Sequence, residues 1–361
     1  MQAVLIREPG HAALTTVPDP VPGAGEALLR VRRVGLCGSD LNSFRGLNPL
    51  VSYPRVPGHE IAATILSLPD SLPANLPHSL IVGLDVTLSP YSHCGQCAAC
   101  LAARFNACQH NQTLGVQRDG ALAEFAAVPV ERLFPATLAQ PALTLEELAL
   151  VEPLTVGFHA VARAQVRPTD TVLVLGSGGV GLGAVAAAAA RGATALAVDL
   201  SDERLAVARL AGAAHALRPD PASPTASLQR QMPAQPILAE QIRDLTSGHG
   251  PSVVIEAIGT PETFRAAVDL VAFAGRVVYI GYAKQPVSYE TRLFVQKELD
   301  IRGSRNALPE DFQAVIQMLA QRRFPLGAAI GSIVPFAEAP STFERWQQNP
   351  GAFSKILITL D

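Results

Sequence analysis

The spacing of apolar and polar positions changes along the chain and predicts two kinds of structure. Up to about residue 150, short apolar runs such as 27–37, ALLRVRRVGLC, and 60–68, EIAATILSL, are separated by segments rich in Pro and Gly. Short runs between turn-forming residues predict short strands in an irregular, mostly β lobe. Residues 145–164, LEELALVEPLTVGFHAVARA, then follow the spacing of a helix.

From Thr171 onward, strand-like and helix-like runs alternate. In chain order these runs are 171–176, 180–193, 195–199, 201–212, 252–259, 261–275 and 276–282. Such alternation predicts parallel βαβ units whose sheet is buried on both faces. Residues 218–236 are rich in Pro and Ser and predict a surface loop.

The length of 361 residues favours more than one core. We therefore expect an α/β protein with a β-rich domain over 1–155 and a parallel-sheet domain over 156–295. The mixed pattern of residues 296–361 predicts a return to the first domain.

Composition narrows the classes of partner. A formal charge of −3 provides no basic field for a nucleic acid. The start of the chain lacks the long apolar region of a signal peptide, and the Ala-rich run 184–198 is broken by Arg191 and Gly192, well short of a membrane span. We expect a cytoplasmic protein with reduced thiols that binds neither nucleic acid nor membranes.

Four of the five cysteines fall in residues 93–108, HCGQCAACLAARFNAC, in the order Cys94, Cys97, Cys100 and Cys108. The spacing C-x2-C-x2-C-x7-C allows four thiolates to surround one ion, and a closed four-sulfur zinc site is structural. An iron–sulfur cluster or a redox role is the alternative. We expect a structural zinc lobe at about residues 90–110.

The fifth cysteine, Cys37, precedes His59 and Glu60 by about twenty residues, and Glu152 lies far downstream. One Cys, one His and one carboxylate suit a second zinc whose fourth position stays open for catalysis. Taken singly, a lone Cys is usually a small buried apolar residue and a lone His a satisfied polar one.

Residues 172–184, VLVLGSGGVGLGA, place Gly176, Gly178 and Gly181 in G-x-G-x-x-G register between a strand and a helix. Glycines let the backbone approach a pyrophosphate at the helix N-terminus. Asp199 ends the next strand, where a carboxylate binds ribose hydroxyls and repels a 2′-phosphate. This pattern favours NAD over NADP, and the alternative is a structural turn without a ligand.

The chain resembles the zinc-containing medium-chain alcohol and polyol dehydrogenases over essentially its whole length. The likeness rests on CGSD at 37–40, PGHE at 57–60, the four-cysteine run, EPL at 152–154 and GSGGVG at 176–181. The segment around Glu152 is similar to the sorbitol and threonine dehydrogenase branch. Together, SYPRVPGHE and IRGSRNA at 301–307 resemble bacterial enzymes acting on sugar acids, such as galactonate-type 5-dehydrogenases.

The resemblance implies a GroES-like catalytic domain, a Rossmann doubly wound parallel-sheet domain, two zinc ions per chain, NAD, and a homodimer or homotetramer. It implies that Cys37 and His59 are catalytic zinc ligands, with Glu152 third, either directly or through water. Glu60 would lie beside the metal and exchange with water or Glu152. Asp40 would orient His59.

For the remaining positions the resemblance also implies roles. Ser39 would hydrogen-bond the substrate oxygen and begin the proton's route outward. The cofactor would contact Gly176, Ser177, Gly178, Gly179, Val180, Gly181, Asp199, Arg204, Ile280, Gly281, Tyr282 and Ser304. We expect the substrate pocket to draw on Asn42, Phe44, Arg45, Glu60 and Arg305. The planar fork of Arg305 suits a carboxylate, and an exposed arginine in a surface salt bridge is the alternative. Many relatives have His at the position of Asn42, and Asn cannot act as a base at neutral pH.

The expected activity is reversible oxidation of a secondary hydroxyl of a small-molecule sugar acid or polyol by hydride transfer. Within enzymes, the alternatives are a threonine, diol or simple alcohol dehydrogenase with the same residues. A zinc-free quinone reductase of the same superfamily is disfavoured, because it would lack both the four-cysteine run and the pair of CGSD and GHE motifs. A non-catalytic NAD(H)-binding structural protein is the alternative from another class.

Overall fold

The computed structural model describes residues 1–74, 76, 79–219, 236–349 and 354–361. Within these ranges the chain forms two compact units. The first unit holds residues 1–153, 308–322 and 326–361, and the second holds 154–307 and 323–325. Most of the predicted loop at 218–236, from 220 to 235, lies outside the described residues.

The first unit is built around antiparallel sheets. Strands β1 (Gln2–Glu8) and β2 (His11–Thr16) form a pair, and a larger sheet has the order β14-β15-β3-β4-β5-β7, with β6 pairing β3. Its strands are β3 (Glu26–Leu36), β4 (Glu60–Ser67), β5 (Asp85–Leu88), β6 (Phe125–Pro129), β7 (Leu133–Pro135), β14 (Ser332–Pro335) and β15 (Ile356–Thr359). Apolar residues of β3, β4 and β15 fill the core of this unit.

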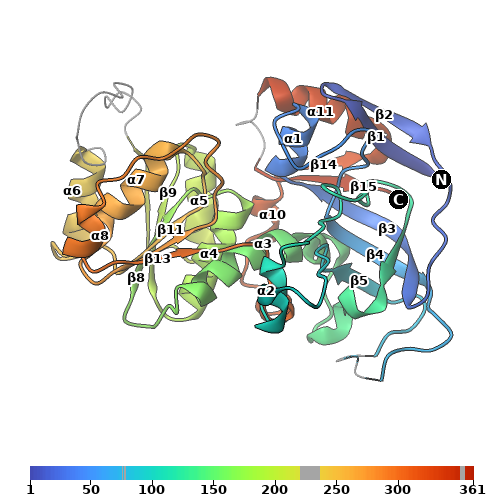
Figure 1. Cartoon of the computed structure of the whole chain (residues 1–361), viewed down its shortest axis with the longest axis horizontal. Coiled ribbons are helices and arrows are strands. Elements are labelled where there is room, and N and C mark those ends of the chain that lie inside the picture. The colour runs from blue at the N-terminus through green and yellow to red at the C-terminus, as the bar shows by residue number, and fades with distance from the viewer. Residues whose placement is uncertain (75, 77–78, 220–235, 350–353) are drawn as a thin grey trace. The chain divides into compact units, whose positions relative to one another are not determined.

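The last strand of the chain returns to one of the first. β15 pairs antiparallel with β3, with Ile356 opposite Leu36, and β14 lies parallel to β15. In Figure 1 the red β15 therefore lies beside the blue β3. This pairing brings residue 355 next to the end of β3, from which Cys37 follows.

The second unit contains a parallel sheet with the order β10-β9-β8-β11-β12-β13, as the alternation predicts. The strands are β8 (Thr171–Leu175), β9 (Thr194–Val198), β10 (His215–Leu217), β11 (Val253–Glu256), β12 (Arg276–Tyr279) and β13 (Asp300–Gly303). The order reverses direction between β8 and β11, and ligands bind at the carboxyl ends of strands at such a point. Because β13 belongs to this sheet, the second unit extends to Ala307, past the predicted boundary at 295. The α/β class with a β-rich part and a doubly wound parallel sheet is confirmed.

Helices complete both units (Figure 1). The first unit has α1 (Gly38–Phe44), α2 (Ala98–Leu101), α9 (Pro309–Ala320), α10 (Leu326–Ala329) and α11 (Ala339–Gln348), with short 3₁₀ turns at Phe105–Ala107, Val130–Arg132, Ala136–Leu138 and Phe336–Glu338. The second has α4 (Gly179–Ala190), α5 (Asp202–Leu210), α6 (Pro236–Leu245), α7 (Pro261–Leu270) and α8 (Arg292–Gln296). The division between the units falls inside α3 (Leu145–Arg163). None of the described helices combines the length and apolarity that crossing a membrane requires.

Candidate functional site

Cys37, His59 and Glu60 come together in the first unit. Cys37 follows β3 and begins α1, while His59 and Glu60 stand at the start of β4, which pairs with β3. One ligand atom from each of the three residues lies within 4.8 Å of the others. The antiparallel pairing of β3 and β4 is therefore what joins the CGSD and PGHE motifs in one place.

The carboxylate of Glu60 is held from two sides. Glu60 is fully buried, and both of its oxygens accept hydrogen bonds of 2.7 Å from Nζ of Lys355, which also donates to the carbonyl of Leu36 at 3.3 Å. Gly35 lies opposite Glu60 on β3, and a Cβ at Gly35 would lie 2.0 Å from Glu60 Oε2. The glycine therefore leaves the space that this carboxylate fills.

Asp40 connects the CGSD and PGHE motifs through hydrogen bonds to the backbone of both. Its Oδ2 accepts the backbone N–H of Cys37 at 2.9 Å, and its Oδ1 accepts the N–H of Gly58 at 3.2 Å. Oδ1 also lies 3.7 Å from Nδ1 of His59. A buried carboxylate on the Nδ1 side of an imidazole favours binding of a metal through Nε2.

Glu152, on α3, is outside the set of three ligand atoms within 4.8 Å, although it is buried and interacts electrostatically with His59. Its Oε1 accepts a hydrogen bond from the hydroxyl of Tyr91, which is also buried. Within this distance the structure therefore groups Glu60, and not Glu152, with both Cys37 and His59.

The titratable groups of this cluster shift one another's pKa values. Burial lowers the pKa of His59, but the charges of Asp40 and Cys37, with a contribution from Glu152, raise it well above its ordinary value. Burial raises the pKa of Glu152 to about 7 against the opposing effect of His59, and the charge of Glu60 adds to the rise. Three carboxyl groups and a thiol face two cationic side chains, His59 and Lys355, so the cluster suits a divalent cation.

The four-cysteine run forms a second compact group. The Sγ–Sγ distances are 3.5 Å for Cys97–Cys100, 3.9 Å for Cys97–Cys108 and 3.6 Å for Cys94–Cys108, and no disulfide is formed. Four sulfurs around one zinc at about 2.3 Å would be about 3.8 Å apart. Backbone N–H groups, of Gln109 foremost, lower the pKa of Cys97 to about 6. These donors stabilise a thiolate, the form that binds a metal.

In the second unit, the glycine turn joins β8 to α4 as the motif predicts. Gly176 has a φ of +96°, and a Cβ at Gly181 would lie 1.8 Å from the carbonyl oxygen of Gly176. No side chain fits at residue 181 unless the turn moves. Gly178 is the N-cap of α4, and a Cβ there would meet nothing within 4 Å, so the helix N-terminus is accessible to an anion.

Asp199 lies at the end of β9 beside this turn. Its Oδ2 accepts the N–H of Ser177 at 2.8 Å, its Oδ1 accepts the N–H of Ser201 at 3.0 Å, and Arg204 Nη1 is 3.9 Å from Oδ2. The carboxylate is thereby fixed at the position where a ribose hydroxyl donor would meet it.

The residues predicted for the nicotinamide end follow β12 and β13. The N–H groups of Ile280 and Gly281 donate to the carbonyl of Glu256 at 2.9 and 3.2 Å. Tyr282 is exposed, and Ser304 is buried with no hydrogen-bond partner for its Oγ among the described residues. The segment after β12 is therefore bonded to the last residue of β11 at the carboxyl edge of the sheet.

Among the residues predicted for the substrate, Phe44 needs correction. Its side chain is 1% exposed, belongs to the core of the first unit and stacks on Phe343 with ring centroids 5.4 Å apart. Arg45 donates to the carbonyl of Gln347 at 2.6 Å, and Asn42 is half-buried on α1. Arg305 lies in the second unit, directly after Ser304.

Three buried residues at these sites escape motif analysis: Tyr91, Lys355 and Glu256. The Oε1 of Glu256 accepts the N–H groups of Ile258 and Gly259 at 2.9 and 2.7 Å and fixes the turn after β11. Two of these three residues could have been found from the sequence, because a charged residue next to an apolar run is unusual. Lys355 has this position in SKILITL, and Glu256 has it in SVVIEAIG. Tyr91 carried no such signal.

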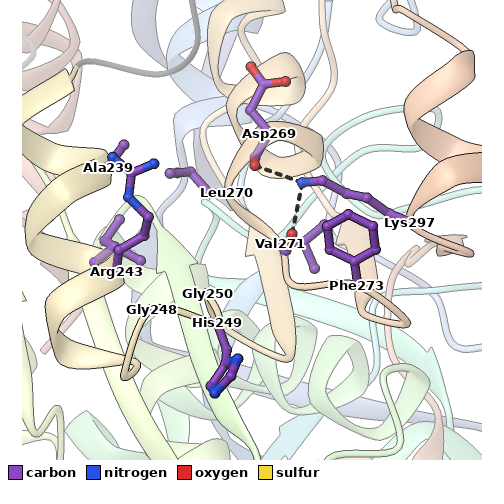
Figure 2. Close-up of a pocket in the computed structure, with 11 residues that line it drawn as sticks. Ala239, Arg243, Gly248, His249, Gly250, Asp269, Leu270, Val271, Phe273 and Lys297 are labelled. Atoms are coloured by element: carbon purple, nitrogen blue, oxygen red, sulfur yellow. Dashed lines mark hydrogen bonds between the residues drawn. The ribbon is translucent and has the colours of Figure 1, made fainter.

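A cavity of about 150 Å³ lies at the opposite, amino edge of the sheet, near the starts of β11 and β12 (Figure 2). Lys297 lines it, but its Nζ donates to the carbonyls of Val268, Asp269 and Val271 at 2.8–2.9 Å. Its three N–H donors are thus used in capping α7, and none of the residues lining this cavity belongs to the two groups described above.

Comparison with known families matches residues 23–138 to the alcohol dehydrogenase GroES-like domain and residues 179–321 to zinc-binding dehydrogenases. L-galactonate-5-dehydrogenase of Escherichia coli K12 is 34% identical over 359 residues, 99% of each chain. Sorbitol dehydrogenase of Bacillus subtilis 168 is 32% identical over 309 residues, 84% of this chain and 81% of that protein. The structure of the Escherichia coli CFT073 alcohol dehydrogenase RspB with NADH is 28% identical, with a TM-score of 0.85 and coverage of 100% of this chain and 99% of that one.

Proposed function

The chain belongs to the zinc-binding dehydrogenase family and is a zinc-dependent alcohol or polyol dehydrogenase; we propose that its substrate is a sugar acid or a related polyol, oxidised at a secondary hydroxyl with NAD. The observation that carries the proposal is the cluster of Cys37, His59 and Glu60 in a chain 34% identical, from end to end, to an L-galactonate-5-dehydrogenase.

We propose two zinc ions per chain. The four cysteines of the lobe would hold one, and no position there remains for a substrate. Cys37, His59 and a carboxylate of Glu60 or Glu152 would hold the other. Bound at this second site, zinc supplies a Lewis acid that lowers the pKa of a substrate hydroxyl.

The chain's own residues then have distinct tasks. Ser39, on the first turn of α1 beside Cys37, accepts the hydroxyl proton and passes it outward. Asp40, whose Oδ1 lies 3.7 Å from Nδ1 of His59, would orient that imidazole. Asn42 has no basic group, so its part is to hydrogen-bond the substrate, and water or a ribose hydroxyl continues the proton's path.

NAD, when bound, supplies the hydride acceptor. Its pyrophosphate would lie on the N-terminus of α4 beside Gly178, and Asp199 would accept hydrogen bonds from the adenosine ribose. The fixed carboxylate of Asp199 repels a 2′-phosphate, which supports NAD over NADP. Ile280, Gly281 and Tyr282 would border the nicotinamide.

The substrate class is tested with aldonates, neutral polyols and amino alcohols, with NADH formation followed by absorbance. Arg305 carries a planar fork that matches a carboxylate. We expect Arg305→Ala to lower kcat/KM on an aldonate at least tenfold and on a neutral polyol less than twofold. Equal losses on both would remove the case for a carboxylate, and turnover of neutral polyols alone would favour a sorbitol-type substrate, as the likeness to sorbitol dehydrogenase allows.

We propose further that the chain forms a homodimer or homotetramer. β13 pairs only with β12 among the described strands, and a sheet edge of this kind can pair with a second copy. Light scattering on the purified protein decides between monomer, dimer and tetramer.

A further inference from the structure

We propose that Tyr91 is a positioning residue that ties the four-cysteine lobe to Glu152 and thereby helps the catalytic cluster retain its metal. This inference rests on the proposed function, because it assumes a metal at Cys37 and His59. It gives the lobe a task beyond its own stability, although the lobe carries no reacting group.

The backbone of Tyr91 closes the base of the lobe. Tyr91 forms an antiparallel bridge with Thr113, and the carbonyl of Pro90 accepts the N–H of Leu114 at 3.1 Å. On the other side, the N–H of Ser92 donates to the carbonyl of Gln112 at 2.9 Å. Segments 90–92 and 112–114 therefore clamp the loop that carries the four cysteines.

The sulfur atoms of the four-cysteine lobe, residues 94–108, bring the two ends of the lobe close together. Cys94 and Cys108, at the two ends of the run, have Sγ atoms 3.6 Å apart, and Cys108 Sγ also accepts the N–H of Cys94 at 3.3 Å. A metal held by the four sulfurs would close this ring of residues 94–108. The position of the Tyr91 backbone is then fixed from the lobe side.

The side chain of Tyr91 points away from this base to the catalytic cluster. Its hydroxyl donates to Glu152 Oε1, and both side chains are buried. The phenol is also close enough to Cys37 and Glu60 to interact with them electrostatically. A fixed donor on one carboxylate oxygen sets the rotation of the whole group, and partners of this kind are worth 10- to 100-fold in metal affinity.

The test is a double-mutant cycle read by metal release. Tyr91→Phe removes one oxygen and keeps the ring, and it is combined with Glu152→Gln. Each zinc-loaded protein is mixed with a chromogenic chelator, and zinc stoichiometry and release rates are recorded. We expect two zincs per chain. Tyr91→Phe should accelerate the release of the zinc at the Cys37–His59 site by about tenfold and leave the release of the other unchanged. In the Glu152→Gln background, Tyr91→Phe should add less than twofold, because its partner is already altered.

Two controls separate positioning from folding. Tyr289→Phe removes a phenol hydroxyl that, among the described residues, donates a hydrogen bond to Tyr279 in the second unit, and it should leave both release rates unchanged. Ser92→Ala loosens the clamp, where Ser92 Oγ accepts the N–H of Gln112 at 3.0 Å, and should accelerate release severalfold. Unchanged release in Ser92→Ala would overturn the link to the lobe.

The outcomes distinguish this inference from the proposed function. One zinc per chain in the parent protein would overturn both. Two zincs, with Tyr91→Phe accelerating release equally in both backgrounds or not at all, would overturn the role of Tyr91 and leave the proposed function standing. The visible spectrum of the cobalt-substituted protein should shift in Tyr91→Phe, which a merely structural role would not cause.

Discussion

Glu60, one of the three residues grouped at the candidate metal site, forms a buried ion pair with Lys355. Glu60 is fully buried and Lys355 is 8% exposed, so neither charge is hydrated by bulk water. The attraction in such a pair is largely offset by the loss of hydration, but removal of one partner leaves an uncompensated charge. The pair therefore adds little to the free energy of unfolding, and its main effect is to fix the position of the Glu60 carboxylate.

Lys355→Met should lower the free energy of unfolding of the first unit by about 3–5 kcal/mol, because the Glu60 carboxylate is left buried and unpaired. Trp346, the single tryptophan, is buried in the core of this unit, and its fluorescence in urea reports the transition. Adding Glu60→Gln should recover part of the loss. The exposed Arg7, in the same unit, provides the control, since Arg7→Met should change stability by less than about 0.5 kcal/mol. A loss below about 1 kcal/mol in Lys355→Met would contradict the buried pair.

At the scale of elements, Asp170 joins the amino ends of three strands of the parallel sheet. Asp170 directly precedes β8. Its Oδ1 accepts a hydrogen bond of 2.8 Å from the hydroxyl of Ser252, which directly precedes β11. Arg276, the first residue of β12, forms a close ion pair with the same carboxylate. The N–H of Arg167 donates to its other oxygen at 2.7 Å. Burial opposes ionisation, but these donors lower the pKa of Asp170 below its ordinary value.

A lowered pKa in the folded state means that ionised Asp170 stabilises the fold above the pKa of the unfolded chain, and that this contribution is lost as pH falls through the folded value. Asp170→Asn should therefore cost about 2 kcal/mol at pH 7. The difference between parent and variant should shrink as pH falls below about 4. Thermal unfolding followed by circular dichroism from pH 7 to pH 3 measures it, and a difference independent of pH would contradict the assignment.

At the scale of the whole molecule, the two sets of functional residues belong to different units. Every residue proposed to bind the catalytic metal lies in the first unit, and the glycine turn and Asp199 lie in the second. Each set is held by contacts within its own unit. Binding of the nucleotide should therefore not require the metal.

Removal of the metal at the Cys37–His59 site with a chelator should abolish turnover and change the Kd for NADH by less than about threefold. Turnover is followed by absorbance and NADH binding by its fluorescence, and added zinc should restore the rate. Full activity in metal-free protein would show that the assigned chemistry is wrong. A parallel loss of NADH binding would show that the units are not independent in this respect.

The sequence by itself determined the features that depend on neighbours along the chain. The four cysteines lie within fifteen residues, and the glycine turn lies between one strand and the helix that follows it. Spacing along the chain alone therefore predicted both the cluster of four sulfurs and the glycine turn. The alternation of apolar runs predicted the parallel sheet for the same reason, because strand and helix periods are local properties.

Only the tertiary structure decided which distant side chains meet. Lys355 reaches Glu60 across 295 positions because β15 pairs with β3, and Tyr91 reaches Glu152 across 61. The pairing of β3 with β4 placed Glu60 within 4.8 Å of Cys37 and His59. Packing of α1 against α11 buried Phe44 in the core. Strand order and helix packing depend on the burial of the whole apolar surface at once, and no local spacing encodes them.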